Sequence, residues 1–152
     1  MLRRVSFGLV LVLAMSGAAA AQSLLLSQES KFPVKETADR LVKAIEEKGL
    51  KVATRVDHAA GAKAAGLEMP PAEVVLFGNP KLGTPLMLSN PEIAIDLPMK
   101  MLVWQDKAGK VRVGYVAPDA LKLRYGIKDR DAAFATMTSA LAAFAKAAAG
   151  AN

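Results

Sequence analysis

The sequence predicts a single α+β domain in which an antiparallel sheet carries two long helices on one face. Short β-rich runs alternate with turns rich in Gly, Asn and Pro, a pattern that is typical of strands joined by short connections. Two longer segments, one after the first strand and one at the C-terminus, have apolar residues at helical spacing. The resulting order, β-α-β(4)-α, favours an antiparallel sheet with both long helices on the same side.

The first 21 residues are predicted to be a secretory signal peptide. Two arginines precede a nearly continuous apolar run over residues 5–15, and small residues fill positions 17–21. The run is well short of the roughly 20 apolar residues that a membrane-spanning helix needs. We therefore expect cleavage after Ala21, a mature domain over residues 22–152 without a membrane span, and a periplasmic or secreted protein.

The first predicted strand and helix occupy residues 23–48. Residues 23–30 form a β-rich run. Pro33 suits the first turn of a helix, where its missing N–H costs nothing, and Gly49 suits the C-terminal cap. Between them, apolar side chains recur at helical spacing: Ala38, Leu41, Val42 and Ile45.

A second strand is predicted over residues 50–57, followed by an Ala-rich short helix over residues 58–66. Regular alternation in this strand would place four side chains on one face: Leu50, Val52, Thr54 and Val56. Two prolines at 70–71 then break the chain, and residues 73–77 form a third β-rich run.

The second half is predicted to hold a short helix, a hairpin and the last helix. Residues 81–89 favour the short helix, and residues 99–105 and 111–117 favour a hairpin joined by a Gly-containing loop. Residues 118–124 indicate a helical turn. Asp129 is expected to begin the last helix, whose apolar stripe is predicted to be Phe134, Met137, Leu141, Phe144 and Ala148. Trp104, beside the hairpin loop, is expected to anchor the fold.

Composition excludes several classes of function. The formal net charge is +6, but the 20 Lys and Arg residues are spread among 14 acids and form no basic run. Because nucleic-acid binding needs a clustered basic patch, we expect no nucleic-acid partner. With no Cys and one His, the chain also cannot build a conventional zinc site, and we predict no metal site. Copper binding through thioethers is disfavoured because the methionines form no Met-x-x-Met cluster.

Several short motifs follow one another in a recognisable order. They are Val56-Asp57-His58, Phe77-Gly78-Asn79-Pro80, Gly83-Thr84-Pro85-Leu86-Met87, Ile95-Asp96-Leu97-Pro98 and Val103-Trp104. Together they resemble the domain-of-unknown-function 302 family over almost the whole mature chain. The resemblance implies a TATA-binding-protein-like β-α-β(4)-α fold with a curved antiparallel sheet. It implies a site but no reaction, and Arg124-Tyr125 stands where the family usually has Arg-His, so a two-histidine site is not available.

Six side chains are candidates for a ligand-binding site: His58, Asn79, Thr84, Asp96, Lys100 and Tyr125. His58 could transfer protons or bind a metal or haem, or it could have a structural role in a loop or helix cap. Asp96 could be held against a cavity by the nearby proline, with Lys100 as its partner, or it could be a turn acid. The segment with Asn79 and Thr84 could present backbone N–H groups to a ligand, or Asn79 could cap a helix.

The favoured interpretation is an exported module that binds a small ligand in a mostly apolar pocket edged by these side chains. One alternative is a small enzyme that uses His58 with Asp96 or Tyr125 as an acid–base pair. Another is a homodimeric interaction domain that associates through the Ala-rich last helix. The sequence identifies no cofactor.

Overall fold

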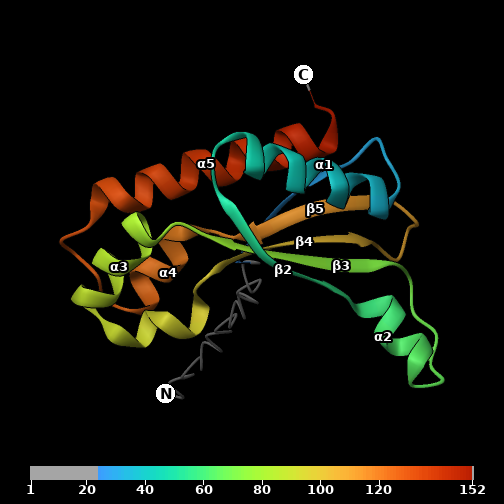
Figure 1. Ribbon diagram of the computed structural model, residues 1–152, viewed down its shortest axis with the longest axis horizontal. Helices are drawn as coiled ribbons and strands as arrows, with labels where there is room; N and C mark the ends of the chain where they lie inside the picture. The colour runs from blue at the N-terminus through green and yellow to red at the C-terminus, as the bar shows by residue number, and fades with distance from the viewer. Residues whose placement is uncertain (1–23, 152) are drawn as a thin grey trace, which may run out of the picture.

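The computed structural model describes residues 24–151 and shows an open five-stranded antiparallel sheet with helices packed against it (Figure 1). Across the sheet the strands follow the order β1-β5-β4-β3-β2, and every neighbouring pair is antiparallel. The strands are β1 (Leu25–Glu29), β2 (Lys51–Asp57), β3 (Ala72–Gly78), β4 (Met99–Gln105) and β5 (Val111–Val116). The α+β class and the β-α-β(4)-α order are therefore confirmed. The predicted signal peptide lies outside the described residues.

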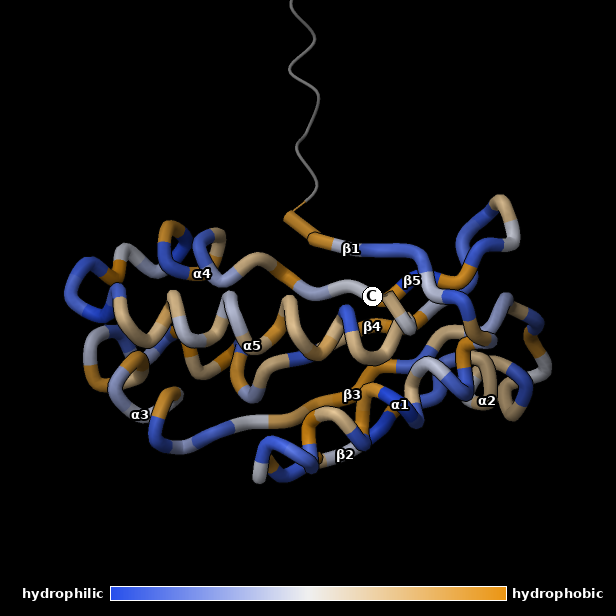
Figure 2. The backbone as a smooth tube through the Cα atoms, turned by 90° about the horizontal axis from the view of Figure 1, so that it is seen from above, coloured by the Kyte–Doolittle hydropathy of each residue, from blue (hydrophilic) through white to orange (hydrophobic). Residues whose placement is uncertain are grey.

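Two long helices cover one face of the sheet, as predicted. Figure 2 shows α1 and α5 side by side above the strands, where the two helices contact each other. Four shorter helices complete the described part of the domain, including one over residues 91–96 that was not predicted and one over residues 118–124 that was predicted as a helical turn. The helices are α1 (Val34–Glu47), α2 (His58–Ala64), α3 (Pro80–Ser89), the 3-10 helix η1 (Pro91–Asp96), α4 (Pro118–Arg124) and α5 (Asp131–Ala149).

The core lies between the sheet and the two long helices. The whole predicted stripe of α5 is buried, and Phe134 and Leu141 are among the largest fully buried side chains. α1 ends as expected, because Gly49 adopts φ +72° and its N–H donates to the carbonyl of Glu46 at 2.8 Å. The start of α5 was predicted wrongly: the helix begins at Asp131, while Asp129 accepts a hydrogen bond from the Ser89 hydroxyl at 2.9 Å.

A β-bulge in β2 overturns the predicted face of this strand. Val52 lies opposite Phe77 and packs toward the helices, but the register shifts before Thr54, which lies opposite Leu76. The extra residue reverses the alternation, so that each side chain after it lies on the face opposite to the one predicted. As a result Arg55 turns toward α1 and forms an ion pair with Asp39 of that helix at 2.8 Å. It forms a second ion pair with Glu73 of the neighbouring strand β3.

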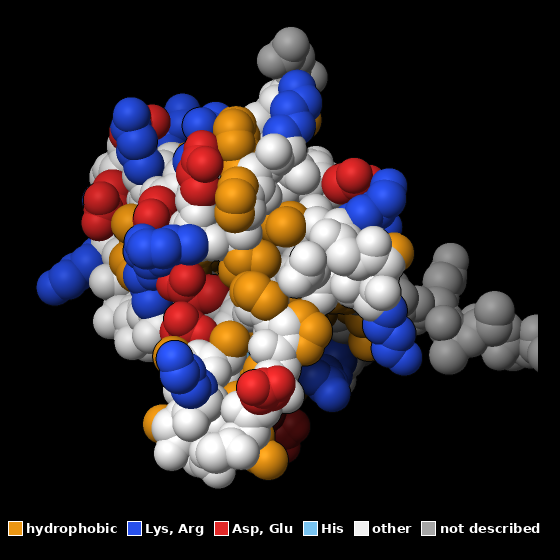
Figure 3. Space-filling model, turned by 90° about the vertical axis from the view of Figure 1, so that its right-hand side faces the viewer, with side chains coloured by type: hydrophobic (Ala, Val, Ile, Leu, Met, Phe, Trp, Pro, Cys, Tyr) orange, Lys and Arg blue, Asp and Glu red, His pale blue; other side chains and the backbone are white. Residues whose placement is uncertain are grey.

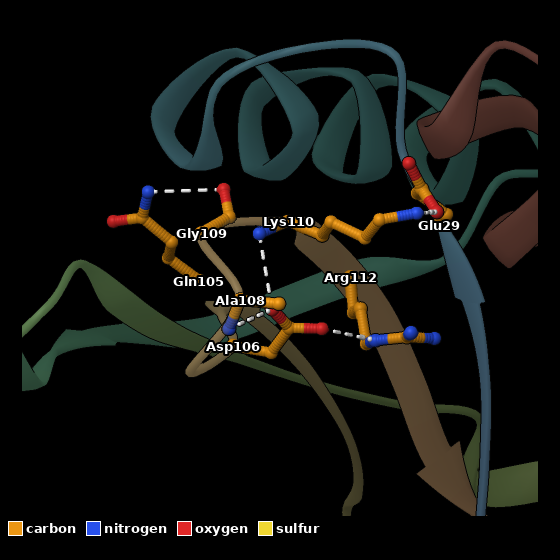
Figure 4. Close-up of polar contacts among 7 residues, drawn as sticks. All are labelled: Glu29, Gln105, Asp106, Ala108, Gly109, Lys110 and Arg112. Carbon is orange, nitrogen blue, oxygen red and sulfur yellow. Dashed lines mark hydrogen bonds and ion pairs between the residues drawn. The ribbon is translucent and has the colours of Figure 1, made fainter.

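The hairpin between β4 and β5 is closed by the carboxylate of Asp106 (Figure 4). Its Oδ1 accepts the backbone N–H groups of Ala108 at 2.9 Å and Lys110 at 3.0 Å, and its Oδ2 accepts the guanidinium of Arg112 at 2.7 Å. The Arg112 hydrogen bond, helped by the two backbone groups, holds the pKa of Asp106 below its ordinary value.

Acid is therefore expected to destabilise the protein partly through Asp106. A lowered pKa in the folded state gives stability that is complete above the unfolded pKa, about 3.9, and is lost as the pH falls through the folded pKa. Asp106→Asn removes this titration, so the variant should lose less stability than wild type between pH 7 and pH 2. Urea midpoints at both pH values measure this difference. Parallel pH profiles for the two proteins would contradict it.

Candidate functional site

An apolar cavity of about 680 Å³ opens where the ends of β2, β3 and β4 meet α3, η1 and α5. Its volume lies within the roughly 300–1,000 Å³ of small-molecule sites. Phe77 and Phe144 meet edge to face at 5.6 Å between ring centres in its wall. The remaining apolar side chains of the wall come from all of these elements and include Leu50, Ala53, Leu82, Met87, Ala94, Leu97, Pro98, Met99, Met137, Ala140 and Leu141.

Two Asn-Pro pairs start the helices that enclose this cavity. The side chain of Asn79 accepts the N–H of Lys81 at 3.0 Å and begins α3, and Asn90 accepts the N–H of Glu92 at 2.9 Å and begins η1. In each pair the proline then occupies the first turn, which suits its fixed φ and missing donor. The two Asn-Pro pairs are therefore the starts of two pocket walls.

Two glycines let these walls approach each other closely. A Cβ added at Gly78 would lie 3.2 Å from Cβ of Pro98, and one added at Gly83 would lie 3.6 Å from Cδ1 of Leu97. The first contact is tight and the second is ordinary van der Waals contact. Gly83 therefore marks a point where a larger side chain would enter the cavity without meeting backbone.

Of the six candidate residues, Asn79 and Thr84 line the cavity. The Asn79 side-chain oxygen is occupied by the α3 cap. The Thr84 side chain is exposed, and within residues 24–151 its hydroxyl has no hydrogen-bond partner. Thr84 thus places a free hydroxyl in the wall that can turn toward a ligand.

Asp96, Lys100 and Tyr125 come together beside the cavity, outside its lining. The Asp96 carboxylate accepts the Tyr125 hydroxyl and the guanidinium of Arg124, the latter at 3.1 Å. The Lys100 amine donates to the backbone carbonyl of Asp96 at 3.0 Å, not to its carboxylate as expected. Asn90, at the other end of η1, donates to the Tyr125 carbonyl at 2.9 Å. Tyr125 therefore joins both ends of η1 to α4.

The hydrogen bond to Asp96 strengthens the hold of the Tyr125 hydroxyl on its proton. This bond is the main cause that raises the pKa of the Tyr125 hydroxyl above its ordinary value, and desolvation adds to the effect. The hydroxyl stays protonated at neutral pH and acts as a donor. Since Ala94 and Leu97 on either side of Asp96 line the cavity, this contact positions one of its walls.

His58 lies at the other end of the molecule. It is exposed at the start of α2, and Asp57, not His58, caps that helix by accepting the N–H of Ala60 at 2.9 Å. α2 and α4 flank opposite ends of the sheet (Figure 1), and the α2 end carries charged side chains of both signs around apolar ones (Figure 3).

The strand register shows that His58 and Asp96 do not share a site. Asp57 lies opposite Glu73, and Met99 lies opposite Phe77. These two levels are four residue steps apart along β3, roughly 13 Å at strand spacing, and His58 and Asp96 lie beyond them at either end. The expectation that both residues edge one pocket is therefore wrong, and their substitutions should have additive effects.

Most of the wall was not among the six candidates. Met87, Met99 and Met137 were set aside as copper ligands and not considered as a ligand-binding wall, although an adaptable thioether is common at binding surfaces. A usable signal was present, because the quoted motifs around Gly78 and Gly83 contain Phe77 and Met87. Within the described residues there is no group of three His, Cys, Asp or Glu side chains that could hold a metal ion.

One described helix, α5, is long and apolar enough to cross a membrane by length and composition. Its apolar stripe is instead buried against the domain's own sheet. The outward side of α5 carries small or polar residues, including Ala135, Thr136 and Ser139. That side lacks the large apolar side chains that usually anchor a homodimer interface.

Comparison with known proteins identifies relatives by sequence and by structure. The model of a family described as "Domain of unknown function DUF302" matches residues 26–144. A crystal structure of an uncharacterised conserved DUF302 protein from Bacillus stearothermophilus superposes with a TM-score of 0.74 at 20% identity, covering 83% of this chain and 98% of that one. This likeness shows the fold.

Two curated relatives carry a different name. The chain is 41% identical over 127 residues to "Fluoride-specific ion channel FluC 1" of Brucella suis biovar 1 (strain 1330), covering 83% of this chain and 50% of that one. The FluC 1 protein of Brucella abortus biovar 1 (strain 9-941) matches at the same identity over 47% of its length. The chain thus spans about half the length of the curated relatives that it matches.

Proposed function

Because this chain belongs to the DUF302 family, whose description states no activity, we propose from its own geometry that it binds a small apolar molecule in the cavity between α3, η1 and α5. The observation that carries this proposal is a cavity of about 680 Å³ with a predominantly apolar wall. Most known small-molecule sites combine such a wall with a few polar groups that fix the orientation of the ligand. Asn79 and Thr84 are those groups here.

The composition of the wall supports binding rather than catalysis. Three methionines line the cavity, and their flexible side chains can adapt to ligands of different shape. A reaction would need titratable groups within reach of one substrate atom. The acid–base alternative lacks this arrangement, since His58 lies at the far end of the sheet and Tyr125 donates its hydroxyl to Asp96 outside the cavity lining.

The ion-channel name of the Brucella relatives is not part of the proposed function. It describes proteins about twice as long as the matched segment. The segment that this chain shares with them is an α+β domain whose long apolar helix packs on its own sheet.

We also propose that the protein is exported, on the strength of the basic, apolar and small-residue order of residues 1–21. Intact-mass measurement of protein from the native periplasm should give a chain that starts at Gln22. A mass that retains Arg3 and Arg4 would contradict export by a cleaved signal peptide.

Filling the cavity is expected to abolish ligand binding without unfolding the protein. In Gly83→Leu the new side chain would lie beside Leu97 inside the cavity, and a leucine is favoured over glycine in a helix by up to about 1 kcal/mol. The affinity for the neutral fluorescent probe N-phenyl-1-naphthylamine should fall at least tenfold, while the urea midpoint should hold or rise.

Gly61→Leu is the matched control for this experiment. Gly61 is also a helical glycine, but it lies in α2, away from the cavity, and a Cβ there would meet nothing within 4 Å. This variant should bind the probe as wild type does. Equal probe binding by wild type, Gly83→Leu and Gly61→Leu would show that the cavity is not the site.

A further inference from the structure

We propose that the natural ligand is a single-chain amphiphile with a monoanionic head, such as a carboxylate, whose tail fills the cavity and whose head lies at Lys51. This inference rests on the proposed function, because it specifies the ligand of the same cavity. It begins from the charges in the wall: among the described residues that line the cavity, Lys51 is the one charged residue, and none is an acid.

The position of Lys51 suits a head group at the rim of the cavity. Lys51 begins β2, which is an edge strand of the sheet, and it lies opposite Gly78, directly before Asn79 in the cavity wall. Its side chain is exposed, so its ammonium group stays hydrated and needs no buried counter-ion. Within residues 24–151 no carboxylate forms an ion pair with it. The single unpaired ammonium group of Lys51 therefore suits a ligand head with a single negative charge.

The neighbouring start of α3 does not compete for this charge. The N–H of Lys81 is bound by the Asn79 side chain, and the N–H groups of Leu82 and Gly83 donate to the Asn79 carbonyl, both at 2.9 Å. These donors are already satisfied, so the charge of the head is met by Lys51, and the free Thr84 hydroxyl is left as a neutral donor in the wall. The wall opposite offers only apolar contact from side chains such as Met87, Met137 and Phe144, which suits an unbranched hydrocarbon tail.

The two parts of the ligand should contribute very unequal shares of affinity. Each methylene buried in the cavity strengthens binding by roughly fourfold. An exposed ion pair at the rim is worth about two- to fivefold at low salt and is screened as salt is raised. Affinity should therefore follow the length of the tail, while the preference for an anion should be modest and should depend on salt.

Displacement of N-phenyl-1-naphthylamine tests this proposal with decanoate, decan-1-ol and decyltrimethylammonium, which share one tail and differ in head charge. Wild type should bind decanoate about threefold more tightly than decan-1-ol, and the cationic amphiphile most weakly. Lys51→Met should remove the difference between decanoate and decan-1-ol while the affinity for decan-1-ol stays the same. Lys48→Met is the control, because Lys48 is also exposed but does not line the cavity, and it should behave as wild type.

The possible failures are distinguishable. If decan-1-ol displaces the probe as well as decanoate does, and Lys51→Met changes neither affinity, the head-group inference is overturned and the apolar site stands. If the probe does not bind to the wild-type protein, and none of the three amphiphiles binds either, the proposed function is overturned as well.

Discussion

Replacing Phe144 by alanine is expected to lower the free energy of unfolding by about 3–5 kcal/mol. Phe144 is 3% exposed and packs edge to face on Phe77 at 5.6 Å. Truncating a buried Phe costs about this much, because it removes apolar burial and leaves a cavity, and the ring pair adds about 0.5–1.5 kcal/mol. Since domains of this size are stable by about 5–15 kcal/mol, the urea midpoint should fall steeply.

Trp104→Ala provides the comparison for Phe144→Ala. Trp104 was expected to anchor the fold, but β4 turns it to the face of the sheet away from the long helices, where it is only half-buried. Its truncation should therefore cost clearly less than that of Phe144. A larger midpoint shift for Trp104→Ala would show that the open face of the sheet, not the helix-covered face, holds the fold together.

Replacing Gly114 by valine is expected to have the second largest effect, a loss of at least about 1–3 kcal/mol. A Cβ at Gly114 would lie 2.7 Å from the carbonyl oxygen of Leu26 and 2.9 Å from Cβ of Ser27. Both atoms belong to β1, which pairs with β5 at this point. The added side chain must push β1 away or distort the strand pairing, and overpacking of this kind is costly because close-packed neighbours cannot yield.

Gly83→Ala is the control for the valine substitution, because its Cβ would meet Leu97 only at 3.6 Å. It should keep or raise stability, since alanine is favoured over glycine in a helix. Urea unfolding of both variants, together with hydrogen exchange of the β1 amides, measures the effect. An unchanged midpoint and unchanged β1 protection in Gly114→Val would contradict the close packing of β1 on β5.

Local signals in the sequence predicted most of the fold. Pro33 and Gly49 bracket α1, and the spacing from Phe134 to Ala148 identifies the buried face of α5. The bulge in β2 escaped prediction, because the alternation from Val52 to Val56 carries no sign of an extra residue. The 3-10 helix η1 was also missed, since its six residues are too few to show a period.

The candidate site was predictable only in part, because its walls come from segments far apart in the chain. Turn residues pointed to Asn79 and Thr84, which line the cavity. Asp96 and Tyr125 do meet, yet their contact holds η1 to α4 and does not face the cavity. His58 was chosen as a candidate because it is the one His of the chain. The number of His residues does not predict where in the fold that residue lies. The wall from α5 depends on how that helix crosses the sheet, which no local pattern contains.

The central claim is that the cavity between α3, η1 and α5 binds an apolar ligand. Methyl NMR of the methionines tests this claim most directly. Met87, Met99 and Met137 line the cavity from three different elements, whereas Met69 lies exposed before β3 and serves as an internal control. On titration with decan-1-ol, the resonances of the three cavity methionines should shift together and saturate at one ligand per protein, while Met69 stays unchanged. Unchanged resonances from all three, or a saturable shift confined to Met69, would contradict the proposed site.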